Sequence, residues 1–128
     1  MVSLLIDAGN TSVKMAISRG DEITDEKRCD ADLLIGEIDS YFHKYQNICV
    51  VAVSDVRGLP ETVYTHLDKI CKKVIRVKGD ISLPINNKYG TPKTLGPDRI
   101  CAAAGAHALF PGKDCVIVDF GTAITFDF

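Results

Sequence analysis

The chain has 128 residues, of which 46% are hydrophobic and 25% charged, a composition typical of a folded globular protein and not of a disordered one. Its formal net charge of −2 gives no basis for binding nucleic acid or an anionic membrane. No apolar run approaches the ~20 residues of a membrane-spanning helix. Strand-like sequence follows Met1 directly, without the basic region of a signal peptide. We therefore expect a cytoplasmic protein with no membrane or nucleic-acid partner.

The cysteines and histidines do not form the pattern of a metal site. The five cysteines are odd in number and widely spaced, without a CxxC pair, which argues against a zinc site or a disulfide scaffold. The three histidines are also far apart. We expect reduced, buried thiols at Cys29, Cys49, Cys71, Cys101 and Cys115.

The first thirty residues predict an antiparallel meander of strands. The apolar run 2–6 ends in Asp7-Ala8-Gly9-Asn10-Thr11, as expected for a strand that enters a tight turn. Residues 13–17 alternate weakly and are followed by a second turn at 19–21, and residues 22–29 can form a third strand. Short turns of this kind join antiparallel neighbours.

Helices and strands alternate after the meander. Asp30 or Asp32 is placed to cap a helix that continues to Phe42. Residues 48–53 form a short, β-branched run, which predicts a strand covered on both faces. A second helix is expected over 63–70.

The remainder of the chain continues the alternation. We expect a strand at 74–77, a loop over the Pro- and Gly-containing stretch 84–97, and an alanine-rich helix that begins at Asp98. Pro111-Gly112 should end this helix, and 115–118 predicts another buried strand. Strands first and alternating helices and strands afterwards predict an α/β fold with a mixed sheet.

One pattern occurs twice. Residues 5–11 and residues 117–123 both consist of an apolar strand, then Asp-x-Gly, then small hydroxyl or amide residues. Glycine lets backbone N–H groups approach a phosphate, and an aspartate at a strand end can hold a cation beside it. Each copy is equally a plain strand-to-turn signal. Two facing copies would hold a nucleoside triphosphate between them.

A second segment, residues 89–99, comes just before the alanine-rich helix. Its last two residues, Asp98 and Arg99, fall at the start of the helix, where free backbone N–H groups favour anions. Asp98 could cap the helix or act in catalysis, and the sequence physics supports both readings equally.

These motifs together resemble the three signatures of type III pantothenate kinases. They are Asp7-x-Gly9-Asn10-Thr11, the segment from Tyr89 to Arg99, and the segment from Asp119 to Asp127, in the family's order. The middle motif is specific to this family, whereas both hairpin motifs occur across the actin, sugar-kinase and Hsp70 superfamily. The resemblance implies an actin-like ATPase (ribonuclease H-like) fold: a first domain at 1–112, and the opening hairpin of a second at 113–128. Pro97 departs from the alanine common in the family and should stiffen the loop.

The resemblance also implies a reaction and a role for each residue. The reaction is transfer of a phosphoryl group from ATP to the primary hydroxyl of pantothenate, the first step of coenzyme A synthesis. Asp98 would be the general base, and pantothenate would bind to Tyr89, Gly96, Pro97, Asp98 and Arg99. ATP would bind to Asp7, Ala8, Gly9, Asn10, Thr11, Ser12, Val13, Lys14 and Thr122. Asp119 would bind a monovalent cation, potassium or ammonium, and Mg²⁺ would accompany ATP.

The family's further properties set two more expectations. Family members are typically homodimers, so we expect a dimer of the complete protein. The chain stops within or just after the second hairpin, so we expect an incomplete portion with little or no kinase activity alone. The apolar side chains of that hairpin should then be exposed, at Ile117, Val118, Ile124, Phe126 and Phe128.

Two alternative functions remain open. The first is a non-catalytic regulatory (Baf-type) relative of the same fold, against which the joint presence of Asp7, Asp98, Arg99 and Asp119 argues. The second is a nucleotide-binding or scaffold module of the superfamily with another substrate. The segment from Tyr89 to Arg99 discriminates against this second reading.

Overall fold

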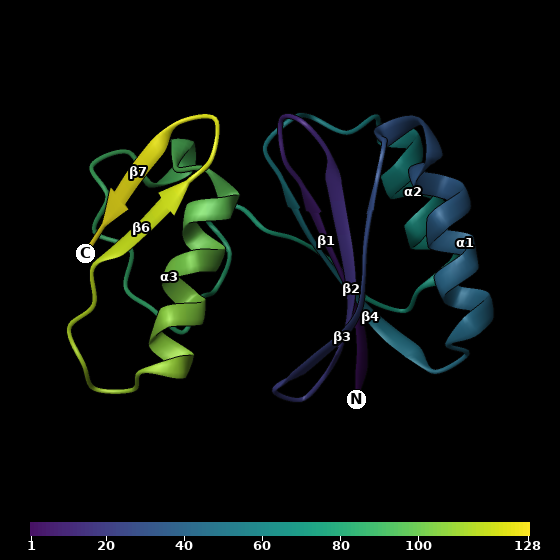
Figure 1. Ribbon diagram of the computed structural model, residues 1–128, viewed down its shortest axis with the longest axis horizontal. Helices are drawn as coiled ribbons and strands as arrows, with labels where there is room; N and C mark the ends of the chain where they lie inside the picture. The colour runs from purple at the N-terminus through teal and green to yellow at the C-terminus, as the bar shows by residue number, and fades with distance from the viewer. The chain divides into compact units, whose positions relative to one another are not determined.

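The computed structural model describes residues 1–128 and divides into two compact units, Met1–Arg76 and Val77–Phe128 (Figure 1). The expected boundary between domains at residue 112 stays a prediction. The longest helix has 13 residues, and none of the helices combines the length and hydrophobicity needed to cross a membrane.

The first unit contains one five-stranded mixed sheet with the strand order β3-β2-β1-β4-β5. The strands β1, β2 and β3 form the predicted antiparallel meander, while β4 and β5 extend the sheet in parallel on the other side of β1. Their bounds are Val2–Ala8 for β1, Val13–Arg19 for β2, Glu22–Cys29 for β3, Ile48–Asp55 for β4 and Val74–Arg76 for β5.

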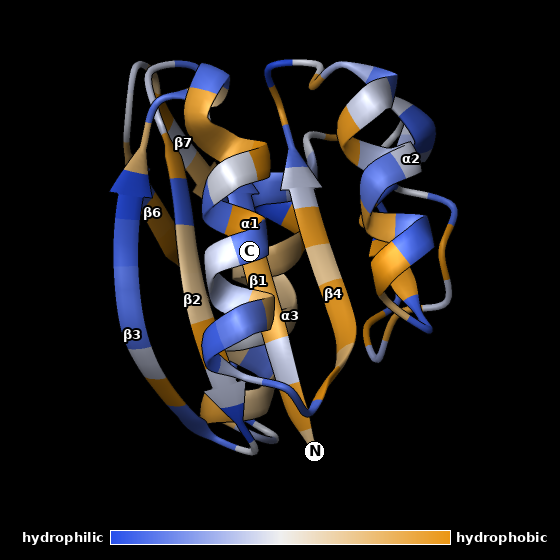
Figure 2. Cartoon of the chain, turned by 90° about the vertical axis from the view of Figure 1, so that its right-hand side faces the viewer, coloured by the Kyte–Doolittle hydropathy of each residue, from blue (hydrophilic) through white to orange (hydrophobic).

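Two helices, α1 (Leu34–Lys44) and α2 (Glu61–Ile70), cover one face of this sheet (Figures 1 and 2). Alternate residues of β1 point toward them and are buried, which explains the apolar spacing of the opening strand. Each fully buried Leu or Ile side chain stabilises the fold by about 1.5–3 kcal/mol. The core under the helices includes Leu4, Ile6, Met15, Ile17, Leu34, Ile38, Val51, Val53 and Leu67.

The prediction that β4 is covered on both faces is wrong. Val51 and Val53 are buried, while Val50 and Ala52, which point the other way, are only partly buried. The β-branched run reflects the strand's central position in the sheet, between β1 and β5, and not two covered faces.

The strand β3 is a charged edge strand. Every residue from Glu22 to Arg28 is exposed, and charged edges of this kind oppose pairing with other chains. Asp25 has φ 53°, in the left-handed region, where the pairing of β2 with β3 shifts register. The hydrogen bonds that Lys44 and Tyr45 donate to its carboxylate hold the pKa of Asp25 below its ordinary value.

The first helix begins without the expected side-chain cap. Asp30 stands before a short 3₁₀ turn, η1 (Ala31–Leu33), and its backbone oxygen, not its carboxylate, accepts the N–H of Leu33. The α-helix then continues directly from this turn, so backbone hydrogen bonds satisfy some of the N–H groups at the helix start that a side-chain cap would otherwise bind.

The second unit contains a 3₁₀ turn η2 (Pro92–Thr94), the helix α3 (Pro97–Leu109) and a hairpin of β6 (Ile117–Phe120) and β7 (Ile124–Asp127). The helix packs against β6, and Ile100 is its one buried residue. Gly112 has φ 72° in the turn after the helix, which agrees with the predicted stop at Pro111-Gly112.

Two predictions in this unit need correction. The strand expected at 115–118 lies two residues later, and it is not buried, because Val118 and Phe120 are exposed. The separate expectation of exposed hairpin side chains is confirmed for Val118, Ile124, Phe126 and Phe128, while Ile117 is partly buried.

The cysteines form no disulfide, as expected, but they are not all buried. Cys29 and Cys71 are buried, Cys49 and Cys115 are partly buried, and Cys101 is exposed. Cys101 lies on α3, where only one residue of the helix is fully covered.

Candidate functional site

The first Asp-x-Gly motif forms the turn between β1 and β2. Asp7 faces Lys14 in the strand register, and Lys14 Nζ lies 3.7 Å from Asp7 Oδ2. The N–H of Gly9 donates to the carbonyl of Ser12 over 3.2 Å and closes the turn. Asn10 and Thr11 are exposed at its tip. The predicted residues from Asp7 to Lys14 therefore form one continuous element whose tip is exposed to solvent, while Ala8 and Val13 are buried in the core.

Gly9 is not required by the shape of this turn. Its φ lies outside the left-handed region, and an added Cβ would meet Ser12 O at 3.5 Å, an ordinary contact. Any small residue could adopt this backbone. The missing side chain instead leaves the backbone of the turn open to close approach by another molecule.

The carboxyl end of β4 lies beside the carboxyl end of β1. Asp7 is in register with Ser54, and the N–H of Val56 donates to Ala8 O over 3.0 Å. Ser54 is buried, and its Oγ has no hydrogen-bond partner in the protein. In open α/β sheets, ligands bind beyond the carboxyl ends of parallel strands.

Asp55, the next residue, fixes the loop that follows β4. Its carboxylate accepts hydrogen bonds from the N–H of Gly58 and Leu59 at 2.9 and 2.8 Å, and from the Tyr64 hydroxyl at 2.8 Å. Burial and this bond raise the pKa of Tyr64 well above its ordinary value. All these contacts are structural, so Asp55 is a supporting residue of this edge of the sheet.

The second Asp-x-Gly motif forms the turn between β6 and β7. The N–H of Gly121 donates to Ala123 O over 3.1 Å, and Thr122 is exposed at the tip. Asp119 lies opposite Thr125 in the register, and its carboxylate makes no hydrogen bond or ion pair. The two motifs thus form the same local structure: an antiparallel turn with polar residues at its tip.

The segment ending in Asp98 and Arg99 forms the start of α3. Pro97 is the first helical residue and Gly96 precedes it, so Asp98 is the second residue of the helix and not its cap. Asp98 Oδ1 accepts the N–H of Arg99 over 2.9 Å. A Cβ at Gly96 would lie 2.5 Å from the same oxygen, so glycine at 96 leaves room for the Asp98 carboxylate.

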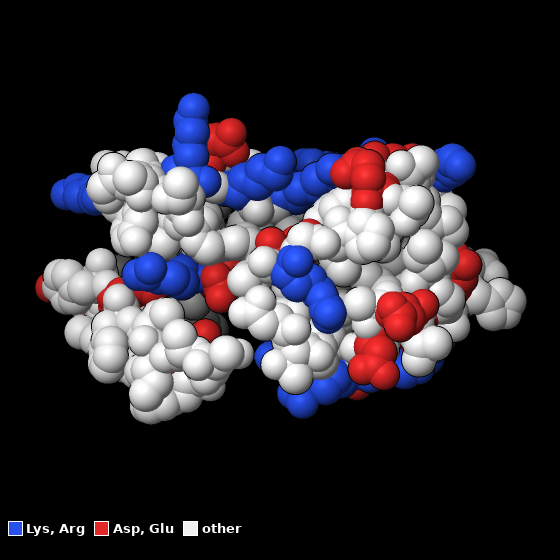
Figure 3. Space-filling model, turned by 90° about the horizontal axis from the view of Figure 1, so that it is seen from above, with Lys and Arg blue, Asp and Glu red and all other residues white.

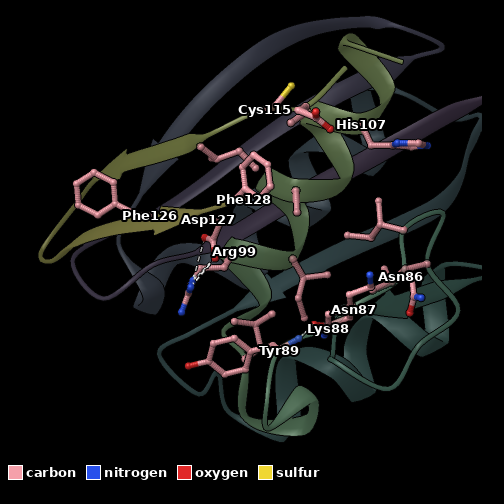
Figure 4. Close-up of a pocket in the computed structure, with 18 of the residues that line it drawn as sticks. Asn86, Asn87, Lys88, Tyr89, Arg99, His107, Cys115, Phe126, Asp127 and Phe128 are labelled. Carbon is pink, nitrogen blue, oxygen red and sulfur yellow. Dashed lines mark hydrogen bonds and ion pairs between the residues drawn. The ribbon is translucent and has the colours of Figure 1, made fainter. Parts of the chain in front are cut away.

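Arg99 reaches from the first turn of α3 to β7. Its Nε donates to the two carboxylate oxygens of Asp127 at 3.1 and 3.0 Å, and its Nη2 donates to Oδ1 (Figure 4). Its guanidinium carbon lies 5.2 Å from the ring centre of Tyr89. The hydrogen bonds that Arg99 donates to Asp127 raise the pKa of Arg99, which is therefore fully charged.

These side chains line a cavity of about 700 Å³ within the second unit. Figure 4 shows Tyr89, Arg99 and Asp127 grouped at one part of its wall. Apolar residues form much of the remainder, among them Leu83, Ile85, Leu95, Ile100 and Ala103. An apolar cavity with a few convergent polar groups is typical of a small-molecule site.

The structure thus brings the predicted residues together in two groups. The residues from Asp7 to Lys14 form one turn of the first unit. Within the second unit, Tyr89 and Arg99 line the cavity, Gly96 and Asp98 adjoin Arg99 at the helix start, and Asp119 and Thr122 lie on the hairpin.

Sequence reasoning missed two residues that the geometry singles out. Asp127 was part of a motif but had no role assigned, and its bond to Arg99 joins positions 28 residues apart. Ser54 gave no signal, because a serine at the end of an apolar strand is common. Only the coordinates show that its hydroxyl is buried without a partner.

Comparison with known proteins identifies the same family that the three sequence motifs resemble. The family model described as type III pantothenate kinase matches residues 3–128. The chain is 36% identical over 127 residues to the type III pantothenate kinase of Bacteroides fragilis, covering 99% of this chain and 51% of that protein. It is 34% identical over 125 residues to the type III pantothenate kinase of Flavobacterium johnsoniae, covering 98% of this chain and 51% of that protein. The chain therefore spans about half the length of the curated relatives it matches.

Proposed function

The chain belongs to the type III pantothenate kinase family and has its α/β, actin-like ATPase fold, and we propose that its complete protein phosphorylates pantothenate with ATP. The product would be 4′-phosphopantothenate, made in the first step of coenzyme A synthesis. The observation that carries this proposal is the family match over residues 3–128, which includes all three motifs.

On the ATP side, we assign phosphate binding to the turn from Asp7 to Lys14. The open backbone at Gly9 and the hydroxyl and amide groups of Asn10, Thr11 and Ser12 can donate hydrogen bonds to phosphate oxygens. Lys14 adds a positive charge beside Asp7. The turn lies at the carboxyl ends of β1 and β4, where open α/β sheets bind ligands.

On the pantothenate side, we assign the general base to Asp98. Its carboxylate makes no ion pair and accepts one hydrogen bond, from the N–H of Arg99. It would take the proton of the primary hydroxyl as that oxygen attacks the γ-phosphorus of ATP and the bond to ADP breaks. Tyr89, Gly96, Pro97 and Arg99 would hold the substrate, with the Arg99 guanidinium facing its carboxylate.

The cations would lie near the second hairpin. Asp119 is exposed without a partner, and its oxygens suit a hard cation such as potassium or ammonium. No group of three or more His, Cys, Asp or Glu in residues 1–128 could by itself hold a metal ion. Mg²⁺ bound with ATP would neutralise phosphate charge, and Thr122 would contact ATP.

Two further properties belong to the proposal. We infer a homodimer in the cytoplasm for the complete protein. Acidic and basic side chains are interspersed on the face shown in Figure 3, which supports the absence of a nucleic-acid partner.

The test is a coupled assay of ADP release with pantothenate, ATP, Mg²⁺ and potassium. We expect turnover by the product of the complete reading frame and little or none by residues 1–128. An Asp98→Asn variant of the complete protein should lose nearly all activity while its melting temperature stays unchanged. A folded protein that binds no pantothenate and shows no turnover would instead favour the regulatory alternative.

A further inference from the structure

The hydrogen bonds between Arg99 and Asp127 are the most specific side-chain contact in the second unit. The carboxylate engages one edge of the guanidinium, formed by Nε and Nη2. Both side chains are mostly buried, with 24% of Arg99 and 20% of Asp127 exposed. Bidentate pairs of this kind fix the plane of an arginine as well as its position.

The pair leaves a defined part of Arg99 for other contacts. Nη1 takes no part in the bonds to Asp127 and belongs to the opposite edge of the guanidinium. The ring of Tyr89 lies 5.2 Å from the guanidinium carbon and restrains it further. Both Arg99 and Asp127 line the cavity, so the restrained group is at the wall of the candidate substrate site (Figure 4).

We propose that Asp127 is a positioning residue, which holds the guanidinium of Arg99 in the orientation that binds the carboxylate of pantothenate. This inference rests on the proposed function, and it gives a role to the last residue of the third motif. It also links two motifs, because Asp127 ends the hairpin that carries Asp119 and Thr122, while Arg99 belongs to the segment that carries Asp98.

The charge of Asp127 should have the opposite effect on the affinity for pantothenate, which makes the inference testable. Asp127 also neutralises Arg99, so removing its charge should strengthen the attraction of Arg99 for an anion. If neutralisation dominates, an Asp127→Asn variant will bind pantothenate more tightly. If positioning dominates, the same variant will bind more weakly, because a mobile arginine loses side-chain freedom on binding.

The experiment compares wild type, Asp127→Asn and Asp127→Ala in the product of the complete reading frame. We expect the KM for pantothenate to rise about tenfold in Asp127→Asn and more in Asp127→Ala, with kcat changed less than about threefold. Asp80→Asn is the matched control, since Asp80 is an exposed aspartate of the same unit with no partner, and its KM should stay at the wild-type value.

A second variant tests whether the effect acts through Arg99. Arg99→Lys should raise the KM by itself, and adding Asp127→Asn to it should raise the KM little further, because the two residues act as one unit. NMR of the Arg99 Nε–H group gives a readout independent of activity: a slowly exchanging signal in wild type that is lost in Asp127→Asn.

The outcomes separate the two proposals. Two results would overturn the positioning role while leaving the kinase assignment intact. One is an unchanged or lower KM in Asp127→Asn, and the other is an equal rise in KM when Asp127→Asn is added to wild type and to Arg99→Lys. Absence of turnover in wild type would overturn the proposed function. A signal of Arg99 that exchanges rapidly in wild type would show that Asp127 does not hold the guanidinium.

Discussion

Replacing Gly9 by alanine should separate the structural from the functional reason for a glycine at this turn. The new Cβ would lie 3.5 Å from Ser12 O, and the backbone is not in the left-handed region, so the folded state accepts it without strain. Alanine restricts the unfolded chain more than glycine, which stabilises a protein by about 0.4–1 kcal/mol at a compatible position. We therefore expect a melting temperature about 1–4 °C higher in the complete protein.

The same substitution should weaken ATP binding. If phosphate oxygens approach the backbone at Gly9, the methyl group prevents at least one hydrogen bond between an N–H and a charged oxygen, a loss of about 1.5–3 kcal/mol. That corresponds to a roughly 10- to 100-fold higher dissociation constant. Isothermal titration with ATP and Mg²⁺ on the product of the complete reading frame measures it, and differential scanning calorimetry measures the stability.

A matched control is Gly36→Ala. Gly36 lies in α1 of the same unit, and a Cβ there would meet no atom within 4 Å. Alanine should stabilise this helix by about 1 kcal/mol and leave ATP affinity unchanged. A stabilised Gly9→Ala variant with wild-type ATP affinity would refute phosphate binding at the turn, and a destabilised one would refute our account of its backbone.

Three further predictions concern the carboxylates. Gly96→Ala should lower kcat at least about tenfold with little change in melting temperature, because its Cβ would displace the Asp98 carboxylate by steric contact; wild-type kcat would contradict the role of Asp98. Asp55→Ala removes the acceptor of three hydrogen bonds and should lower the free energy of unfolding by about 3 kcal/mol in urea titration, with a smaller loss in Asp55→Asn. Because the pKa of Asp25 is lowered in the folded state, its carboxylate stabilises the fold above the ordinary aspartate pKa, and this stabilisation is lost as pH falls through the lower folded-state value. Urea titrations of Asp25→Asn should therefore show a smaller difference in the free energy of unfolding between pH 6 and acid pH than wild type shows.

The sequence predicts the first unit well because its signals are local. The apolar run at 2–6, the weak alternation over 13–17 and the continuous run at 48–53 place β1, β2 and β4, and helical spacing places α1 and α2. The incomplete burial of one side of β4 could not be predicted, since an apolar run does not reveal how many faces of a strand are covered.

The second unit was harder to predict because its structure depends on pairing. The expected strand at 115–118 began two residues early, since Cys115 and Val116 are as apolar as the residues that do pair, and the register is set by the turn at 121–123. Asp98 was expected to open α3, but proline fixes the first helical position one residue earlier.

The candidate site was predictable as motifs but not as contacts. The sequence identified Asp7, Asp98 and Asp119 through their neighbours in the chain. It could not predict that Arg99 pairs with Asp127 or that the Ser54 hydroxyl lacks a partner, because both facts depend on how distant residues pack. The individual roles assigned to Asp7, Asp98 and Asp119 stay predictions.

The partners of the aspartates give a physical reason to expect chemistry at these motifs. Asp25 and Asp55 each accept several hydrogen bonds from side chains or backbone groups of the fold, so their carboxylates are explained by structure alone. Asp119 has no partner, Asp98 accepts only the next backbone N–H, and Asp7 has one exposed lysine at 3.7 Å. Stability does not require carboxylates at these three positions. Each of the three motifs therefore contains one aspartate whose charge the fold does not use. A site for phosphates and their cations would need such carboxylates.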